Sequence, residues 1–317
     1  MNTIYAARST SGAVTLDKVW RQDKAGGLAE GYTSFASVKV GIRSVLFAYN
    51  GAAKKLDAYA LAGTTPWQPQ QVACTPDLAG GPWDSLSAFI LGNEAYLLAY
   101  RRDDGMFGFF HVAADLTLSP PYTVAWARNW PTQGFSTVAP FTSLSQQFVL
   151  GYDVETGTVA NFSLGVTPSS DGGIPALLLL NAWYHRWAKG WRHFAFFQYG
   201  GSNFFFKINT AVLNVNIDHI QDNPAMGTVE IGSYLQGQLP DALKIDIAAA
   251  VPWVDGDPHL LTYIAASGST VLYRIHGDCK GWTSLCVCAT PPMSTQAIPY
   301  RIADTSYVLF YGDSITT

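Results

Sequence analysis

Charge is scarce in this sequence. Lys, Arg, Asp and Glu make up 13% of the 317 residues, the formal net charge is −4, and no run of lysine or arginine occurs. Proteins that bind nucleic acid need clustered positive charge to neutralise phosphates. The composition therefore excludes nucleic acid as a first candidate partner.

Long hydrophobic runs are also missing. No apolar run reaches the roughly 18 residues that a membrane-spanning helix requires, and no cleavable signal sequence precedes Ile4. We therefore expect a soluble protein with no membrane span, which would be secreted only if a leader has been removed.

The common catalytic and metal-binding motifs are absent. The sequence has no phosphate-binding loop, dinucleotide fingerprint or Gly-x-Ser-x-Gly elbow, and its six histidines show no metal-ligand spacing. Among the four cysteines, Cys286 and Cys288 are too close for a zinc motif and would share one face of an alternating strand. We expect no metal and no cofactor. Free thiols are expected, with a disulfide to Cys279 as the alternative.

Aromatic residues, by contrast, are abundant. The chain has 10 Trp, 16 Tyr and 17 Phe, and hydrophobic residues make up 48% of it. Aromatic and β-branched residues favour strands, so most of these rings are expected to pack between strands. A minority could line a binding site.

A short segment of two apolar residues, a spacer and an aromatic or aliphatic residue recurs along the chain. We call its last residue the anchor, and the segments are Leu46–Tyr49, Leu97–Tyr100, Val149–Tyr152, Phe205–Ile208, Leu260–Tyr263 and Val308–Tyr311. A weaker seventh copy, Ile4–Ala7, opens the sequence. The average spacing is about 51 residues, which is typical of repeat architectures.

Two further landmarks keep the same register. With Ala7 of the weaker copy counted as the first anchor, a turn residue or a strand start stands five positions after each of the first six anchors. These residues are Gly12, Lys54, Gly105, Gly157, Leu213 and Gly268. Seventeen positions before the last six anchors stand Tyr32, Trp83, Phe135, Trp191, Asp246 and Ser294. Alternating strands follow the turn residues, as expected for hairpins with one buried face.

This pattern predicts an all-β fold, a single β-propeller domain over residues 1–317. The repeat indicates six blades of about 51 residues, each with four strands, and seven blades are possible because both ends of the chain have a strand of the same phase. We expect the ring to close by pairing of the terminal strands. Helical repeats are disfavoured, since no window sustains a 3.6-residue apolar period.

The repeat length and the aromatic residues at blade openings resemble fungal and bacterial propeller lectins. The resemblance implies binding of a carbohydrate or other small molecule by aromatic stacking. It does not extend to a repeated polar binding triad, because the polar neighbours change between copies. Two alternatives stay open: a single-pocket enzyme acting on an apolar small molecule at the mouth of the central channel, such as a natural-product cyclase or pericyclase, and a scaffold that binds another protein.

The stretch from Trp191 to Ile220 is the clearest copy, and it also deviates from the others. It has Ile208 in place of tyrosine and Leu213 in place of glycine, beside the densest group of Trp and His. The candidate ligand-binding residues are the blade-opening aromatics and nearby polar side chains: Trp191, His193, Arg192, Trp83, Tyr32, Phe135, Arg43 and Arg101.

Overall fold

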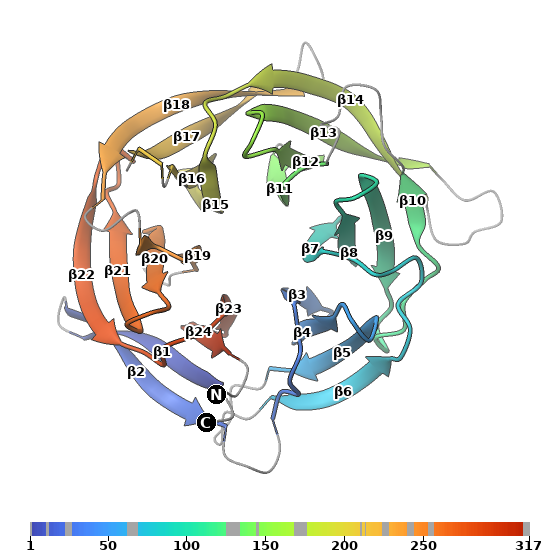
Figure 1. The fold of residues 1–317 in the computed structure, drawn as a ribbon, viewed down its shortest axis with the longest axis horizontal. Coiled ribbons are helices and arrows are strands. Elements are labelled where there is room, and N and C mark those ends of the chain that lie inside the picture. Colours follow the sequence, from blue (N-terminus) through green and yellow to red (C-terminus); the bar gives the residue numbers. More distant parts are fainter. Residues whose placement is uncertain are drawn as a thin grey trace.

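The structure is a computed structural model of the chain. It describes residues 2–10, 13–22, 27–61, 69–124, 134–143, 146–167, 176–209, 211–212, 214–223, 228–239, 244–252 and 257–312. Six four-stranded antiparallel sheets form a closed ring (Figure 1), which confirms the six-bladed propeller. No helix in these residues is long and apolar enough to cross a membrane.

Each blade has an inner strand beside the ring axis (Figure 1) and three strands that follow it outward. The inner strands are β3 (Ser34–Val40), β7 (Ser85–Leu91), β11 (Thr137–Ser143), β15 (Trp191–Tyr199), β19 (Ile247–Val251) and β23 (Gln296–Ile302). The second strands, which end at or beside the anchors, are β4 (Arg43–Asn50), β8 (Glu94–Arg101), β12 (Gln146–Tyr152), β16 (Ser202–Asn209), β20 (His259–Ile264) and β24 (Thr305–Tyr311).

The third and outer strands complete the blades. The third strands are β5 (Lys55–Ala60), β9 (Met106–Val112), β13 (Thr158–Thr167), β17 (Asn214–Asn223), β21 (Ser269–Ile275) and β1 (Thr3–Thr10). The outer strands are β6 (Gln70–Thr75), β10 (Tyr122–Val124), β14 (Ala176–Arg186), β18 (Thr228–Gln238), β22 (Trp282–Ala289) and β2 (Ala13–Arg21). We number the blades 1 to 5 from β3–β6 to β19–β22, and call the sheet of β23, β24, β1 and β2 the closing blade.

The closing blade joins the two ends of the chain, as expected. Strand β1 pairs with β24 in the register Ala7↔Ser306 and continues to β2 on its other side. The prediction that Ile4–Ala7 is a seventh copy of the anchor segment is therefore wrong, because β1 is the third strand of its blade and anchors end second strands. This assignment removes the reason for considering a seventh blade.

The hydrophobic core is divided into six clusters, one between each pair of neighbouring blades. Four of the six predicted turn residues are described and have the conformation expected of a turn, while Gly12 and Leu213 lie outside the described residues. Lys54, Gly105, Gly157 and Gly268 all have positive φ, between 54° and 73°, in the hairpin between second and third strands. Glycine adopts this conformation without steric cost. We call the face with these turns the second-hairpin face, and the face with the turns between inner and second strands the first-hairpin face.

The anchors hold the blades together on the second-hairpin face. Each anchor tyrosine hydroxyl accepts a hydrogen bond from a backbone N–H that precedes or begins the inner strand of the next blade. The pairs are Tyr311 with Tyr32 (3.0 Å), Tyr49 with Trp83 (3.1 Å), Tyr100 with Phe135 (2.6 Å), Tyr152 with Trp191 (3.3 Å) and Tyr263 with Ser294 (2.9 Å). The two landmarks of the repeat are therefore the two ends of one interaction between blades.

The fifth copy departs from the predicted spacing by one residue. The N–H of Asp246 bonds the carbonyl of Tyr263, as that of Asp84 bonds the carbonyl of Tyr100. Asp246 thus corresponds to the residue after a landmark, and the buried Ile245 occupies the landmark position. The cause is one additional residue between β19 and the anchor, since Ile247 pairs with Tyr263 and Ser85 with Tyr100.

Candidate functional site

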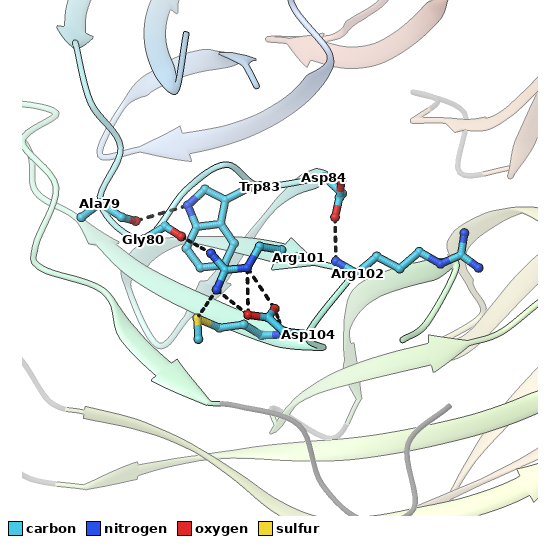
Figure 2. Close-up of polar contacts among 8 residues, drawn as sticks. Ala79, Gly80, Trp83, Asp84, Arg101, Arg102 and Asp104 are labelled. Atoms are coloured by element: carbon cyan, nitrogen blue, oxygen red, sulfur yellow. Dashed lines mark hydrogen bonds and ion pairs between the residues drawn. The ribbon is translucent and has the colours of Figure 1, made fainter. Parts of the chain in front are cut away.

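The blade-opening aromatic side chains are buried between strands. Trp83 is 2% exposed, and its indole N–H donates to the carbonyl of Ala79 at 3.2 Å (Figure 2). A side chain at Gly108 would lie 2.7 Å from this ring, so only glycine leaves room for it. Tyr32, Phe135 and Trp191 are 4%, 1% and 5% exposed. Rings this covered offer no open face on which a planar ligand could stack.

Arg101 is fully engaged with its own blade. Its Nε lies 2.9 and 3.0 Å from the two carboxylate oxygens of Asp104, and Nη1 donates to the carbonyl of Gly80 at 2.5 Å. The guanidinium carbon lies 5.5 Å from the centre of the Trp83 ring, as Figure 2 illustrates. The structure therefore brings Trp83 and Arg101 together, but the contact holds a loop against a hairpin.

Tyr32 belongs to a buried hydrogen-bond network. Its hydroxyl donates to Asp57 at 2.6 Å and lies 2.6 Å from the hydroxyl of Tyr59. Burial, followed by these hydrogen bonds, raises the pKa of Tyr32 far above its usual value. Lys55 pairs with the same carboxylate at 2.8 Å. The network is satisfied internally and connects β5 to the closing blade through the Tyr32 backbone.

Blade 4 replaces the usual tyrosine hydroxyl with other groups. Its anchor is Ile208, which has no hydroxyl, and the His193 ring instead interacts with the backbone of Ile245 in blade 5. His193 sits at an irregularity of β15 with φ of 57°. Burial is the main cause that lowers the pKa of His193. The deviation from the repeat is therefore a second way of joining two blades.

A buried ion pair lies beside this exception. Lys207 Nζ is 2.5 Å from Asp218 Oδ2, and the ammonium lies 3.9 Å from the Trp187 ring and 4.6 Å from the Trp191 ring. Burial lowers the pKa of Lys207 and raises that of Asp218, against their mutual attraction. Both side chains are 5% exposed or less, so the pair does not face a ligand site.

The remaining predicted residues lie far apart in the ring. Arg192 is an exposed residue of β15, and it is followed directly by His193. Arg43 begins β4 on the first-hairpin face, and its guanidinium donates to the carbonyl of Ala114 in blade 2. The eight candidate residues thus belong to blades 1 to 4 and to both faces. A role for them in ligand binding stays a prediction.

One hollow of the structure lies on the first-hairpin face. It has a volume of about 830 Å³ and lies between blade 1 and the closing blade, with Pro252 of blade 5 at its edge. The described lining residues include three cationic side chains, Lys39, Arg43 and Arg301, and no Asp or Glu. Apolar residues such as Val38 complete the wall. Of the eight predicted residues, only Arg43 lines this hollow.

The cationic side chains of the hollow have few internal partners. Arg301 donates from Nε to the carbonyl of Ala303 at 3.0 Å, and its Nη2 is 3.5 Å from the largely exposed carboxylate of Asp304. Lys39 is exposed and makes no hydrogen bond or ion pair with the described residues. The hollow therefore has unneutralised positive charge, which favours an anion.

Lys39 and Arg301 occupy equivalent positions in neighbouring blades. Each stands one residue before the end of its inner strand, where Lys39 pairs with Ser44 and Arg301 with Ser306. The residues at this position in blades 2, 3 and 4 are Ile90, Thr142 and Gln198. Sequence reasoning missed this pair, although both lie ten residues before an anchor. A comparison of the residues ten positions before each anchor would have identified these two cations.

The candidate chemistry of the inner strands is limited. None of the six inner strands contains Asp or Glu. Asp84 and Asp246 stand just before two of them, and each accepts a backbone N–H, from Arg102 at 2.6 Å and from Ala265 at 2.7 Å. In blade 3, Ser136 makes the equivalent bond, so these carboxylates act as structural acceptors. The described residues contain no group of three or more His, Cys, Asp or Glu side chains placed to hold a metal.

Comparison with known proteins supports the fold. No protein-family model matches the chain, and no curated protein matches it in sequence. Among solved structures, a candidate 6-phosphogluconolactonase from Bacteroides fragilis aligns with a TM-score of 0.58 at 13% identity, covering 94% of this chain and 84% of that one. The periplasmic gluconolactonase of Pseudomonas aeruginosa aligns with a TM-score of 0.52 at 13% identity, over 94% and 85% of the two chains.

A third structure shows the same architecture with another activity. An α-L-arabinofuranosidase from Clostridium thermocellum aligns with a TM-score of 0.51 at 13% identity, covering 81% of this chain and 93% of that one. At these identities the likeness establishes the propeller fold and no more.

The lectin interpretation is wrong. The structural relatives are described as lactone and glycoside hydrolases, and the rings expected to stack on sugars are buried. The error arose because packing between blades and stacking on sugars require the same residue types. The two alternatives, a single-pocket enzyme acting on an apolar small molecule at the channel mouth and a scaffold that binds another protein, stay predictions.

Proposed function

We propose that this protein is a hydrolase of a small anionic carbohydrate derivative, a sugar lactone with a phosphate or carboxylate group, at the hollow between blade 1 and the closing blade. The observation on which the proposal rests is the concentration of Lys39, Arg43 and Arg301 in a hollow that has no carboxylate among its described lining residues. A volume of about 830 Å³ suits a ligand of this size.

The anionic group of the substrate would be recognised by the arginines. A guanidinium presents parallel N–H donors that match the oxygens of phosphate or carboxylate. Arg43 and Arg301 approach the hollow from different blades, so they can contact separate parts of one ligand. Ser37 and Ser44 also line it, and their hydroxyls can bond to sugar hydroxyl groups.

Positive charge also suits the chemistry of lactone opening. Water adds to the ester carbonyl, negative charge develops on the carbonyl oxygen, and the ring C–O bond then breaks to give the hydroxy acid. A fixed cation beside that oxygen lowers the barrier by stabilising the developing charge. Lys39, whose ammonium has no described partner, is our candidate for this role.

Glycoside hydrolysis receives less support from this site. That reaction generally uses two carboxyl groups about 5 to 9.5 Å apart on either side of the scissile bond. The hollow has none among its described lining residues. The carboxylates nearest the inner strands, Asp84 and Asp246, already bind turn backbone.

The experiment is a comparison of two lactones that differ by one phosphate group. We expect faster hydrolysis of 6-phosphogluconolactone than of gluconolactone, followed by acid release in a pH-stat. Lys39→Ala and Arg301→Ala should each lower the rate. The matched control is Lys18→Ala, which removes one exposed charge from β2 in the outer rim. Equal rates for both lactones, or an equal loss in the control, would contradict the proposal.

A further inference from the structure

The outer strand of blade 5 holds two thiols side by side. Cys286 and Cys288 are two residues apart on β22 and pair with Leu272 and Thr270 of β21. Alternation along a strand directs both side chains to the same face. Val287, between them, is 68% exposed on the other face. The prediction that the thiols share a face is confirmed.

The shared face is directed towards the closing blade. Cys286 packs against the cluster that includes Tyr5 and Leu272, and both cysteines are half-buried and unoxidised. The pair thus lies on one face of the strand with partial access to solvent.

The strand geometry favours a bridging ion over a disulfide. Residues two apart in a strand have Cα atoms about 6.6 to 6.8 Å apart, at the upper end of the range of about 4.4 to 6.8 Å that disulfides span, and above their most frequent separation of about 5.5 to 6 Å. A metal ion bonded to two sulfurs at about 2.3 Å each can join side chains whose sulfurs are too far apart for a direct bond.

The number of ligands limits the choice of metal. Structural zinc takes four ligands, and no third His, Cys, Asp or Glu joins the pair among the residues described. Soft thiolates select Cu(I), zinc and iron–sulfur clusters; zinc and the clusters take four protein ligands, whereas Cu(I) accepts two sulfur ligands. We propose that Cys286 and Cys288 form a two-thiolate site for a soft monovalent metal ion, Cu(I). On binding, the two thiols release two protons and the ion becomes a bis-thiolate complex, with no change in oxidation state.

The test is anaerobic titration of the reduced protein with Cu(I) in competition with bicinchoninate. We expect one Cu(I) bound per chain in the wild type and none in Cys286→Ser or Cys288→Ser. Cys74→Ser is the matched control, because Cys74 is an exposed single thiol, and it should bind as the wild type does. Thermal unfolding of each variant checks that the propeller is intact.

A second probe makes the result independent of copper chemistry. Phenylarsine oxide condenses with two neighbouring thiols and releases one water, so intact-protein mass spectrometry should show one adduct in the wild type and none in either serine variant. Unchanged Cu(I) binding in Cys288→Ser would overturn the proposal. So would an oxidised pair, seen as two missing thiols in an Ellman titration of freshly isolated protein that return after reduction.

Discussion

The two faces of the propeller are built in opposite ways. On the second-hairpin face, five of six blade junctions repeat the same bond from a backbone N–H to an anchor tyrosine. On the first-hairpin face, the equivalent position holds a different residue in each of the five blades compared: Lys39, Ile90, Thr142, Gln198 and Arg301.

This difference separates stability from ligand recognition. A bond that recurs at each junction serves the ring as a whole, whereas side chains that occur in only two neighbouring blades mark one place on it. In this molecule the repeated residues explain the fold, and the positions that do not repeat locate the candidate site. The following predictions test that division, from the largest expected effect to the smallest.

Truncation of a blade-opening aromatic should have the largest effect. Trp83→Ala removes an indole that is 2% exposed and should lower the free energy of unfolding by about 3 to 5 kcal/mol, since the cavity cannot fully collapse. Ile42→Ala, at a side chain that is 97% exposed on the other face, should change it by less than about 0.5 kcal/mol. Urea denaturation measures the unfolding free energy of both variants. Equal losses in the two variants would contradict the separation of stability from ligand recognition.

Loss of one anchor hydroxyl should have an intermediate effect. Tyr100→Phe leaves the N–H of Phe135 without its acceptor at 2.6 Å, which should cost about 1 to 3 kcal/mol. Burial raises the pKa of Tyr100 to about 12, so ionisation of the hydroxyl does not complicate measurement near neutral pH. A Tyr100→Phe variant as stable as the wild type would show that this bond is not needed for the ring.

The cationic pair should affect binding without affecting stability. The double variant Lys39→Ala/Arg301→Ala should stay within about 0.5 kcal/mol of the wild type in unfolding free energy. Its affinity for 6-phosphogluconate, measured by calorimetry, should fall about tenfold or more for each charge lost. The wild-type affinity should decrease with added salt, because the attraction is electrostatic. An unaltered affinity would place the anion site elsewhere.

The smallest effect concerns the exceptional junction of blade 4. Burial keeps the pKa of His193 in the folded protein below its usual 6.5. As pH falls below that value, the unfolded chain takes up a proton at His193 before the folded chain does, so unfolding becomes more favourable. Its contribution to stability is therefore present above pH 6.5 and lost below it. His193→Gln should flatten the decline between about pH 7.5 and 5.5 in urea denaturation, and an identical slope would exclude this role.

Much of the fold could be predicted because its landmarks have one physical cause. The anchor and the blade-opening residue touch, so their spacing repeats along the chain even where the residue types vary. Positive φ at Lys54 and the three glycines recurs for the same reason, since each hairpin needs one such residue. The ends were harder to interpret, because Ile4–Ala7 imitates an anchor by composition while pairing as a third strand.

The candidate site was less accessible to sequence reasoning. Lys39 and Arg301 are separated by most of the chain, and only ring closure makes their blades neighbours. The predicted site was based on the aromatic residues at the blade openings, but packing between strands accounts for those residues. The useful sequence feature was a single charged residue in an otherwise uncharged inner strand, ten positions before the anchor, as at Lys39 and Arg301.

The closing blade has a consequence for synthesis of the chain. Strands β1 and β2 leave the ribosome before the other described strands, but their partner sheet begins with β23, roughly 275 residues after β2 ends. At 5 to 20 residues per second, the first two strands wait about 15 to 55 seconds for a partner. An unpaired edge is a template for association with other chains. The β1–β2 hairpin has three cationic residues, Arg8, Lys18 and Arg21. Their charges disfavour edge-to-edge association with other chains until β23 and β24 are synthesised.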